Sequence, residues 1–549
     1  MQPEPSTPFI DLVLSKRLIV CCLLVGWPLA NGAFGDEAGR PNILIAVSDD
    51  QSFPHASAYG CRSIRTPAFD RIAKEGVLFN AAFTPAPGCS PMRAAFLTGR
   101  EIWMIREAGT HASTFPDDLP VFTKQLAESG YHVGATGKGW GPGKAIGWEH
   151  NPAGKSYQKR NNDSPKGVSS TDYAENFRDF LKSKPEQSPF CFWFGGHEPH
   201  RVFDKGIGEK NGIDAAQIDV PRFLPDVPEV RSDLADYFFE IQWFDRHLMR
   251  MLDQLESNGE LENTLVIVTS DNGMSFPRAK ANLYEFGIHM PLAMSWPKRI
   301  PAGQVNDDLV TLLDIAPTIF AASRVTPREA ERLAGFNLLP RLSNADDSAP
   351  LRAAVFSGRE RHSSSRYNSL GYPSRCVRTE QFLYIRNFKP ERFPAGAPQK
   401  YAKASYNEEG SLVASKLGPE HGGYHDIDAC PTFDWMIRNR ADPRASSLFQ
   451  YSVGLRPHEE LFDIRKDPSC LNNLAEDSMF QRVRDQHRVL LDNYLKETGD
   501  LRLTDPDAAN VWETYQRVSG LRWFPKPDWA SENPASVPRQ PWLELRRPR

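Results

Sequence analysis

Short hydrophobic runs alternate, along the first 345 residues, with longer segments whose apolar side chains recur at helical spacing. The run at residues 43–47 is aliphatic without interruption, which is typical of a strand buried on both faces of a parallel sheet. Further strands are predicted at residues 131–136, 189–194 and 264–269, and helices at 66–73, 118–129 and 232–255. This alternation predicts an α/β fold with a mostly parallel sheet flanked by helices.

The pattern changes after about residue 345. A polar stretch at 343–350 precedes shorter strand candidates at 353–356 and 382–385, a helix at 478–498 and a tail rich in proline and tryptophan. We therefore predict two domains. The larger spans residues 38–345, and a smaller α+β domain with an antiparallel sheet, a helix and an extended tail spans 350–549.

The N-terminus has the pattern of a secretory signal peptide at residues 1–33. Lys16 and Arg17 precede an apolar run at 18–30, and small residues follow at 31–33. The run is shorter than the roughly 20 residues that span a bilayer, and no later segment reaches that length. The alternative is a buried helix of the folded domain. We expect an exported protein, periplasmic or secreted, with no integral membrane segment in its mature form.

Composition narrows the function classes. Lys and Arg number 65 against 69 Asp and Glu, so the formal charge of −4 argues against a nucleic-acid-binding protein. Two of the eight cysteines, Cys21 and Cys22, would leave with the signal peptide. The remaining cysteines are irregularly spaced and contain no CxxC, which excludes zinc-ribbon and thioredoxin motifs and leaves disulfide pairing open.

Two acidic pairs follow predicted strands. Asp49 and Asp50 come after the first strand, and Asp271 and Asn272 come after the strand at 264–269. Ligands in open α/β sheets bind at the carboxyl ends of strands, and Ca²⁺ and Mg²⁺ prefer carboxylate and amide oxygens. Each pair could instead be an exposed turn. Together they predict a site for a hard cation.

The run Cys89-Ser-Pro-Met-Arg93, continued to Thr98-Gly99-Arg100, is the most specific in the chain. It closes a loop and opens a helix, so residue 89 is placed at a positive helix end that suits anions. An isolated buried cysteine is usually structural, and that alternative applies here too.

This run resembles the type I sulfatases, in which the cysteine of Cys-x-Pro-x-Arg is converted to formylglycine by a dedicated maturation enzyme. Further segments are similar to the family in the same order: residues 40–50, 136–138, 197–200, 270–273, 313–318 and 459–475. The stretches at 269–284 and 372–378 resemble the members that hydrolyse N-sulfated glucosamine. The resemblance implies an alkaline-phosphatase-like α/β fold and a catalytic domain at 38–345.

The resemblance also implies roles for individual residues. Cys89, as formylglycine, would be the nucleophile and a ligand of one Ca²⁺, together with Asp49, Asp50, Asp271 and Asn272. Arg93, Lys138 and Lys280 would stabilise charge on the sulfate, and His197 would protonate the leaving group. The implied partners are a sulfated saccharide substrate, such as a heparan-type glycosaminoglycan fragment, and the formylglycine-generating enzyme.

Three positions depart from the family pattern. Met92 stands where Ser is usual, Trp140 where family members often carry His, and Lys280 where the N-sulfate-specific members have Arg. Met92 leaves the Cys, Pro and Arg of the motif in place. Trp140 leaves open which residue donates the proton to the leaving group. Lysine keeps the charge but loses the bidentate fork of arginine.

Other readings stay open at this point. The same cation clamp suits a phosphate or phosphonate ester hydrolase, and a chain whose Cys89 is never matured could be a non-catalytic sulfated-glycan binding protein. The choice between N-sulfate and O-sulfate is also open. His200 and His111 are further candidates, and residues 359–362 (Arg-Glu-Arg-His) could hold an acidic sugar or form an exposed loop.

Overall fold

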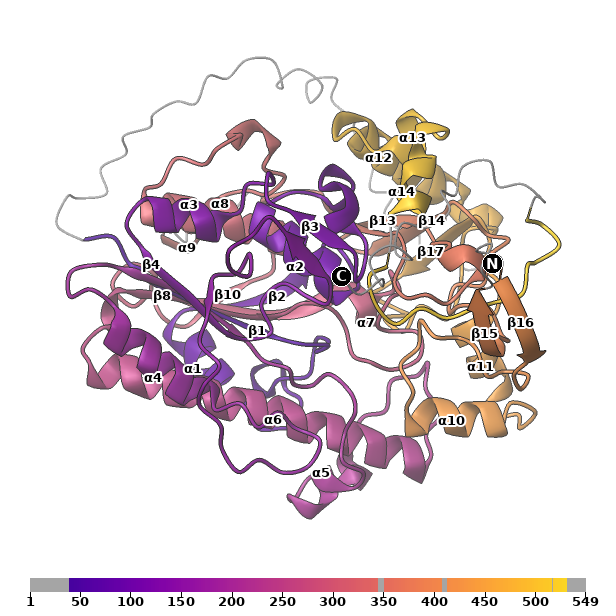
Figure 1. Ribbon diagram of the computed structural model, residues 1–549, viewed down its shortest axis with the longest axis horizontal. Helices are drawn as coiled ribbons and strands as arrows, with labels where there is room; N and C mark the ends of the chain where they lie inside the picture. The colour runs from indigo at the N-terminus through magenta and orange to yellow at the C-terminus, as the bar shows by residue number, and fades with distance from the viewer. Residues whose placement is uncertain (1–38, 344–349, 407–411, 516, 531–549) are drawn as a thin grey trace, which may run out of the picture. The chain divides into compact units, whose positions relative to one another are not determined.

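A nine-stranded mixed sheet dominates the computed structural model, which describes residues 39–343, 350–406, 412–515 and 517–530 (Figure 1). The strand order is β10-β2-β9-β8-β1-β7-β4-β6, with β11 paired to β2. The strands are β1 (Asn42–Ser48), β2 (Val77–Phe83), β4 (His132–Gly137), β6 (Lys155–Ser156), β7 (Phe190–Gly195), β8 (Thr264–Ser270), β9 (His289–Ser295), β10 (Gln304–Asn306) and β11 (Val310–Thr311). Only β9 is antiparallel to its neighbours, so the predicted fold class is confirmed.

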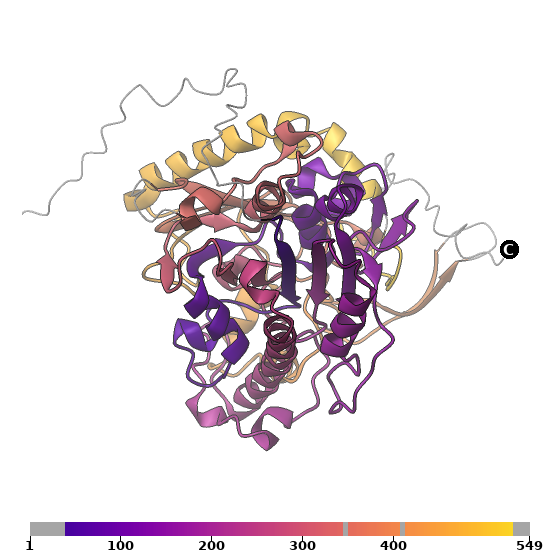
Figure 2. The same cartoon turned by 90° about the vertical axis from the view of Figure 1, so that its left-hand side faces the viewer.

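The central strand β1 is buried on both faces, as its unbroken aliphatic run predicts. Ile43, Ile45 and Val47 belong to the hydrophobic cluster that includes α2, α3 and α8, whereas Leu44 and Ala46 belong to the cluster that includes α1, α4 and α6. Figure 2 shows the strands of this sheet lying between the helices that flank it. These helices are α1 (Pro67–Glu75), α2 (Cys89–Thr98), α3 (Phe122–Glu128), α4 (Tyr173–Ser183), α6 (Pro228–Ser257) and α8 (Ile315–Ser323).

A second, four-stranded sheet is antiparallel throughout, in the order β12-β13-β14-β17. Its strands are β12 (Ala354–Arg359), β13 (Ser374–Thr379), β14 (Phe382–Asn387) and β17 (Glu459–Asp463), and α12 (Gln481–Glu497) packs on β13 and β14. Two strand pairs stand apart, β3 (Thr114–Pro116) with β5 (Lys144–Ile146) and β15 (Tyr401–Tyr406) with β16 (Leu412–Leu417). The remaining α-helices are α5 (Ile207–Lys210), α7 (Glu285–Ile288), α9 (Leu339–Ser343), α10 (Pro431–Arg438), α11 (Ser446–Val453), α13 (Leu501–Thr504) and α14 (Val511–Thr514).

Two helices begin elsewhere than predicted. The helix expected from residue 118 begins at Phe122, because Pro120 disfavours a helical conformation at the residue before it. The helix expected from residue 232 begins earlier, with Val227 as its N-cap and Pro228 in the first turn. Proline is tolerated there because a backbone N–H in the first turn has no helical hydrogen bond to make.

Several contacts connect the region of the central sheet with the second region, which contains the four-stranded sheet. Helix α10 packs on α6, and buried side chains of both lie in one hydrophobic cluster. At a second place Glu285 of α7 accepts two hydrogen bonds from Arg378 of β13, at 2.9 and 3.0 Å. Such contacts bring loops of the second region to the edge of the central sheet. The predicted domain boundary at 345–350 stays a prediction.

The predicted signal peptide, residues 1–33, and most of the polar stretch at 343–350 lie outside the described residues. Within the part of the chain that the structure describes, no helix combines the length and apolar character needed to cross a bilayer.

Candidate functional site

Two acidic pairs leave neighbouring parallel strands at the same edge of the central sheet. Ser48 of β1 lies opposite Ser270 of β8, so the residues that follow each strand emerge side by side. The backbone N–H of Asp50 donates to Asp271 Oδ1 at 3.1 Å. Asn272 Nδ2 donates to Asp50 Oδ1 at 2.7 Å. The structure thus brings together the four side chains that the sequence places at strand ends, and all of them are buried.

Cys89 is the first residue of α2 and lies beside these carboxylates. Its Sγ is 3.9 Å from Asp50 Oδ1, and every residue of α2 is buried. Burial and the charge of Asp49 raise the pKa of the Cys89 thiol well above its usual value, and Lys138 and Lys280 only partly oppose this. An unmodified Cys89 is therefore a neutral thiol at pH 7 and a weak nucleophile.

Three cations hold the carboxylates in place. Lys138 Nζ is 2.5 Å from Asp49 Oδ2, and Lys280 Nζ is 2.6 Å from Asp50 Oδ2. Arg93, on the same helix as Cys89, donates from Nε to Asp271 Oδ2 at 2.7 Å. Its NH1 donates to the backbone oxygen of Lys138 at 2.5 Å, which ties the loop after β4 to α2. All three cations predicted from the sequence thus converge on the acidic cluster.

The pKa values of the ionisable groups in this cluster are shifted in different directions. Burial alone raises the pKa of Asp49, but the surrounding cations, Lys138 foremost, outweigh it and hold that pKa well below its usual range. Burial, together with the negative charge of Asp49, raises the pKa of Asp271 to about 6. Burial disfavours the charged form of Lys280, yet Asp428 and Asp50 raise its pKa well above the usual value.

The donor set fits a hard divalent cation. Ligand atoms of Asp49, Asp50 and Asp271 lie within 4.8 Å of one another. Asp49 Oδ1 and Asn272 Oδ1 are buried and accept no hydrogen bond from any described residue. Because buried oxygens are normally satisfied, these two are oriented for a partner that is not a protein donor. Carboxylate and amide oxygens suit Ca²⁺ or Mg²⁺.

Two histidines lie at this edge of the sheet. His200 Nε2 is 3.9 Å from Asp50 Oδ2 and joins Asp49 and Cys89 in a second group of potential metal ligands. His197 follows β7, and the residue is exposed. The pKa of its ring is lowered to about 4, chiefly by partial desolvation. That pKa also responds to the charges of Asp49 and Lys138. Both therefore lie within electrostatic reach of the cluster, and His200 is the nearer to Asp50.

Trp140, which departs from the family pattern, has a structural contact here. Its indole Nε1 donates to the backbone oxygen of Ser90 at 3.0 Å, and its ring packs edge-on against Phe115. The indole thereby fixes the first turn of α2. It offers no proton to a leaving group, because an indole N–H does not ionise near neutral pH.

Part of the site consists of residues that the sequence indicates only weakly or not at all. Asp428 Oδ2 accepts from Lys280 Nζ at 2.8 Å, although Asp428 lies in a loop far along the chain. His362 is buried and stacks on His111 with ring centroids 4.3 Å apart. A Cβ placed on Gly88, next to Cys89, would meet His362 Nδ1 at 3.0 Å. Residues 359–362 are thus buried beside the site and do not form an exposed loop.

No pattern around Asp428 could have revealed it, since no predicted strand or spaced motif precedes it. His362 carried a weak signal in its basic run. Both residues reach the site only because the second region packs against the first.

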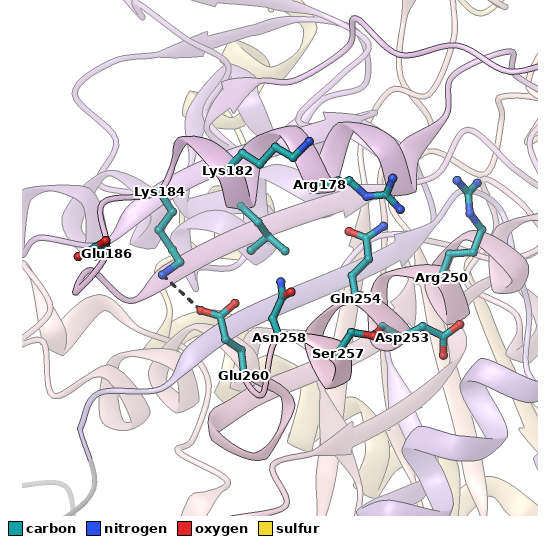
Figure 3. A pocket seen from close by; sticks show the side chains of 11 residues that line it. Arg178, Lys182, Lys184, Glu186, Arg250, Asp253, Gln254, Ser257, Asn258 and Glu260 are labelled. Carbon is teal, nitrogen blue, oxygen red and sulfur yellow. Dashed lines mark hydrogen bonds and ion pairs between the residues drawn. The ribbon is translucent and has the colours of Figure 1, made fainter.

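A separate cleft of about 760 Å³ lies between α4 and the C-terminal half of α6 (Figure 3). It is lined by residues of mixed charge, among them Arg178, Lys182, Lys184 and Glu260, and Lys184 pairs with Glu260 at 3.3 Å. None of the predicted site residues lines it. No motif in the sequence points to a function at this cleft.

Comparison with known proteins defines the class. The model of the sulfatase family matches residues 41–325, more than half of the chain, and the chain belongs to that family. It is accordingly a hydrolase of sulfate esters or sulfamides. A second model, described as the C-terminal part of N-sulphoglucosamine sulphohydrolase, matches residues 278–392.

Individual relatives extend the match. The chain is 28% identical to human N-sulphoglucosamine sulphohydrolase over 508 residues, covering 86% of this chain and 93% of the human one. It is 25% identical to an ulvan-active sulfatase of Formosa agariphila, over 84% of this chain and 76% of that protein. Among solved structures, BT4656 in complex with its substrate D-glucosamine-2-N,6-O-disulfate matches with a TM-score of 0.58 at 20% identity, over 85% of this chain and 99% of that one. The last likeness is one of fold.

Proposed function

We propose that this sulfatase removes sulfate from a sulfated saccharide, with N-sulfated glucosamine as the first candidate substrate. The observation that carries the proposal is the convergence of four oxygen ligands, two lysines and a histidine on Cys89 at one edge of the sheet. The match of residues 278–392 to the C-terminal part of N-sulphoglucosamine sulphohydrolase supports the N-sulfate assignment. The alignment with human N-sulphoglucosamine sulphohydrolase supports it as well, because it covers 93% of that protein.

Asp49, Asp50, Asp271 and Asn272 would hold one Ca²⁺, with residue 89 as a further ligand. The ion would supply charge stabilisation for an ionised hydroxyl and for the sulfate oxygens. The two unpartnered oxygens of Asp49 and Asn272 support this assignment.

Residue 89 would act after conversion of the thiol to formylglycine. The hydrated aldehyde supplies one hydroxyl to attack sulfur and a second whose deprotonation expels sulfate. The neutral, buried thiol of Cys89 is a poor substitute because it is protonated at pH 7.

The chain's own cations then have distinct tasks. Lys138 and Lys280 present ammonium groups beside residue 89 and would bind the sulfate oxygens as charge builds on them. Arg93 touches Asp271 and the Lys138 backbone, so it positions both and keeps one NH2 group, unpartnered and buried, toward Asp49.

A histidine would protonate the departing amine or oxygen. His197 remains the proposed donor because its exposed ring can meet a leaving group at the mouth of the site. His200, closer to Asp50, would orient that carboxylate or bind a sulfate oxygen. Trp140 leaves no donor at the position where family members often have His.

A substrate panel tests the proposal. Matured protein would be incubated with glucosamine N-sulfate, with 6-O- and 2-O-sulfated sugars, and with matching phosphate esters, and released sulfate or phosphate would be measured. We expect sulfate and free amine from the N-sulfated sugar. Cleavage of O-sulfated sugars alone would leave the family intact and overturn the N-sulfate assignment, and preferential release of phosphate would favour a phosphate ester hydrolase.

The metal has its own test. Metal analysis of purified protein should find one divalent cation per chain, and Asp271→Asn should lower that content together with the rate. The matched control is Asp442→Asn, which changes a partly exposed carboxylate paired with Arg444. Full activity after thorough chelation would contradict the calcium assignment.

We also propose that residues 1–33 direct export and are removed, and that the maturation enzyme acts on Cys89. Mass spectrometry of the exported protein would test both. An intact N-terminus, or active enzyme carrying only unmodified Cys89, would contradict the respective proposal.

A further inference from the structure

Three arginines, Arg361, Arg517 and Arg522, lie on chain segments that contact the histidine pair beside residue 89 or its sequence neighbours. Arg361 is 4% exposed, whereas Arg517 and Arg522 are partly exposed. Among the described residues, no carboxylate lies within ion-pair distance of any of the three. This is unusual because most arginines around them are paired: Arg359 and Arg366 both bind Asp426.

Arg361 is the least satisfied of the three. Its NH2 donates only to Thr110 Oγ1, at 3.2 Å, and its buried NH1 has no partner. Burial, followed by the positive charge of Arg517, lowers the pKa of Arg361 to about 9. A buried cation costs free energy unless an anion compensates it, so the arrangement is incomplete as protein alone.

Hydrogen bonds connect Arg517 to the histidine pair beside the reactive residue. Arg517 NH1 lies 2.9 Å from His111 Nδ1 and donates to the backbone oxygen of His362 at 2.8 Å. The stacked rings of His111 and His362 then reach Gly88, the neighbour of Cys89. One pair of imidazoles therefore separates Arg517 from the backbone of Gly88, just before α2.

The segment that carries two of the arginines is fixed to the site by main-chain contacts. Val518 N–H donates to the oxygen of Ala112 at 2.8 Å, and Arg522 N–H donates to Ser364 Oγ at 3.1 Å. Both anchoring residues neighbour the histidine pair in sequence. Arg517 and Arg522 lie beyond both matched family segments, which end at residues 325 and 392.

We propose that Arg361, Arg517 and Arg522 form a subsite that binds a second anionic group of the substrate while the sulfate to be cleaved lies at residue 89. The group is a sulfate or a carboxylate, because both match the forked donors of arginine. This inference rests on the proposed function and deepens it: the preferred substrate carries two negative groups. Those groups could sit on one sugar, as two sulfates, or on adjacent sugars, as a sulfate and a uronate.

The test compares three substrates: glucosamine N-sulfate, glucosamine N,6-O-disulfate, and a disaccharide with a terminal N-sulfated glucosamine linked to a uronic acid. The measured quantity is the ratio of kcat/KM for each doubly charged substrate to that for the singly charged one. We expect wild-type protein to favour at least one doubly charged substrate, and the favoured one identifies whether sulfate or carboxylate is the second group.

Arg517→Ala should lower that ratio about tenfold, the usual scale for one lost hydrogen bond to a charged group. Arg517→Lys should restore part of it, because the charge remains. The matched control is Arg178→Ala, which removes a half-exposed arginine from α4 and should leave the ratio unchanged. Arg522→Ala provides a second variant, and circular dichroism checks that each variant folds.

A ratio that Arg517→Ala and Arg522→Ala leave unchanged would overturn the subsite, as would wild-type protein that does not distinguish the substrates. If the wild type cleaves the singly charged sugar in either case, the proposed function stands and only the subsite fails. If it cleaves no sulfated sugar, the proposed function itself fails.

Discussion

One side of the site is built from strand ends and the start of a helix, and the other side is built from loops of the second region. On the first side, the register of β1 and β8 alone places Asp49 next to Asp271. On the second side, Asp428 and His362 reach the same place from chain segments with no regular structure at those positions. The first side holds the groups to which we assign the chemistry at residue 89, and the second contributes neighbours that change the charge and surroundings of those groups. The two sides should therefore differ in how they respond to substitution.

The largest effect is expected on the first side. Cys89→Ala should lower turnover by at least about 10⁴-fold, the scale of losing a nucleophile. The melting temperature should change little, because one sulfur atom is lost. Steady-state assays and thermal denaturation measure the two quantities. Cys376→Ala is the matched control, since it removes an equally buried thiol from β13, and it should retain turnover. Comparable losses in both variants would mean that the effect is one of folding.

The next effect concerns the junction between the two sides. Glu285→Gln breaks a buried ion pair with Arg378 and should lower the free energy of unfolding by about 3 kcal/mol, measured by denaturant titration. Burial raises the pKa of Glu285, but Arg378 and His289 outweigh it and lower that pKa to about 2. The wild type's advantage should be present above about pH 4.5 and shrink as the pH falls toward 2. Glu380→Gln, at an exposed pair, should have almost no effect. A difference that persists unchanged at low pH would contradict the ion-pair explanation.

A smaller loss is expected at the histidines. His197→Ala should lower kcat/KM about 100-fold for a sugar substrate but much less for a nitrophenyl sulfate, whose leaving group needs no proton. Because the pKa of His197 is lowered to about 4, its acid form declines above that pH, and kcat/KM should fall as the pH rises. His200→Ala is the comparison variant and should affect both substrates alike. Equal losses on both substrates in His197→Ala would exclude it as the proton donor.

The smallest effect is expected on the second side of the site. Asp428→Asn keeps an acceptor for Lys280 but removes the charge that raises the pKa of this lysine, so kcat/KM should fall about tenfold. Asp442→Asn serves as the control, since it changes a partly exposed carboxylate paired with Arg444. A loss as large as that of Cys89→Ala would show that the second side is as essential as the first, and no loss would show that Asp50 alone is sufficient to position Lys280.

The sequence predicts the first side well because its determinants are local. Uninterrupted aliphatic runs mark β1 and β8, and the residues just after them must emerge at one edge if the strands are parallel neighbours. The convergence of Asp49, Asp50, Asp271 and Asn272 follows from that pattern alone. Lys138 and Lys280, in contrast, were recognised through the resemblance to a family, since isolated lysines carry no local signal.

The second side could not be predicted in the same way. Asp428 acts through a contact with Lys280, 148 residues away along the chain, and nothing in its neighbours encodes that contact. The buried run at 359–362 looks like a solvated charge cluster until the partners of its side chains are known. Arg359 pairs with Asp426, and Glu360 pairs with Arg375 and Arg502. The starts of α3 at Phe122 and of α6 at Pro228 differ from the prediction for a simpler reason, because nearby prolines shift both helix boundaries.

The complete burial of α2 has a consequence for the order of events in the life of the protein. A sugar sulfate needs to reach only one atom group of residue 89, whereas a modifying enzyme must take hold of the peptide on both sides of it. In the folded chain all ten residues of α2 are buried, and Gly88 abuts His362. The proposed conversion of Cys89 would therefore have to precede the packing of this helix. Folding and maturation would then compete in time, and a chain that folded first would remain inactive.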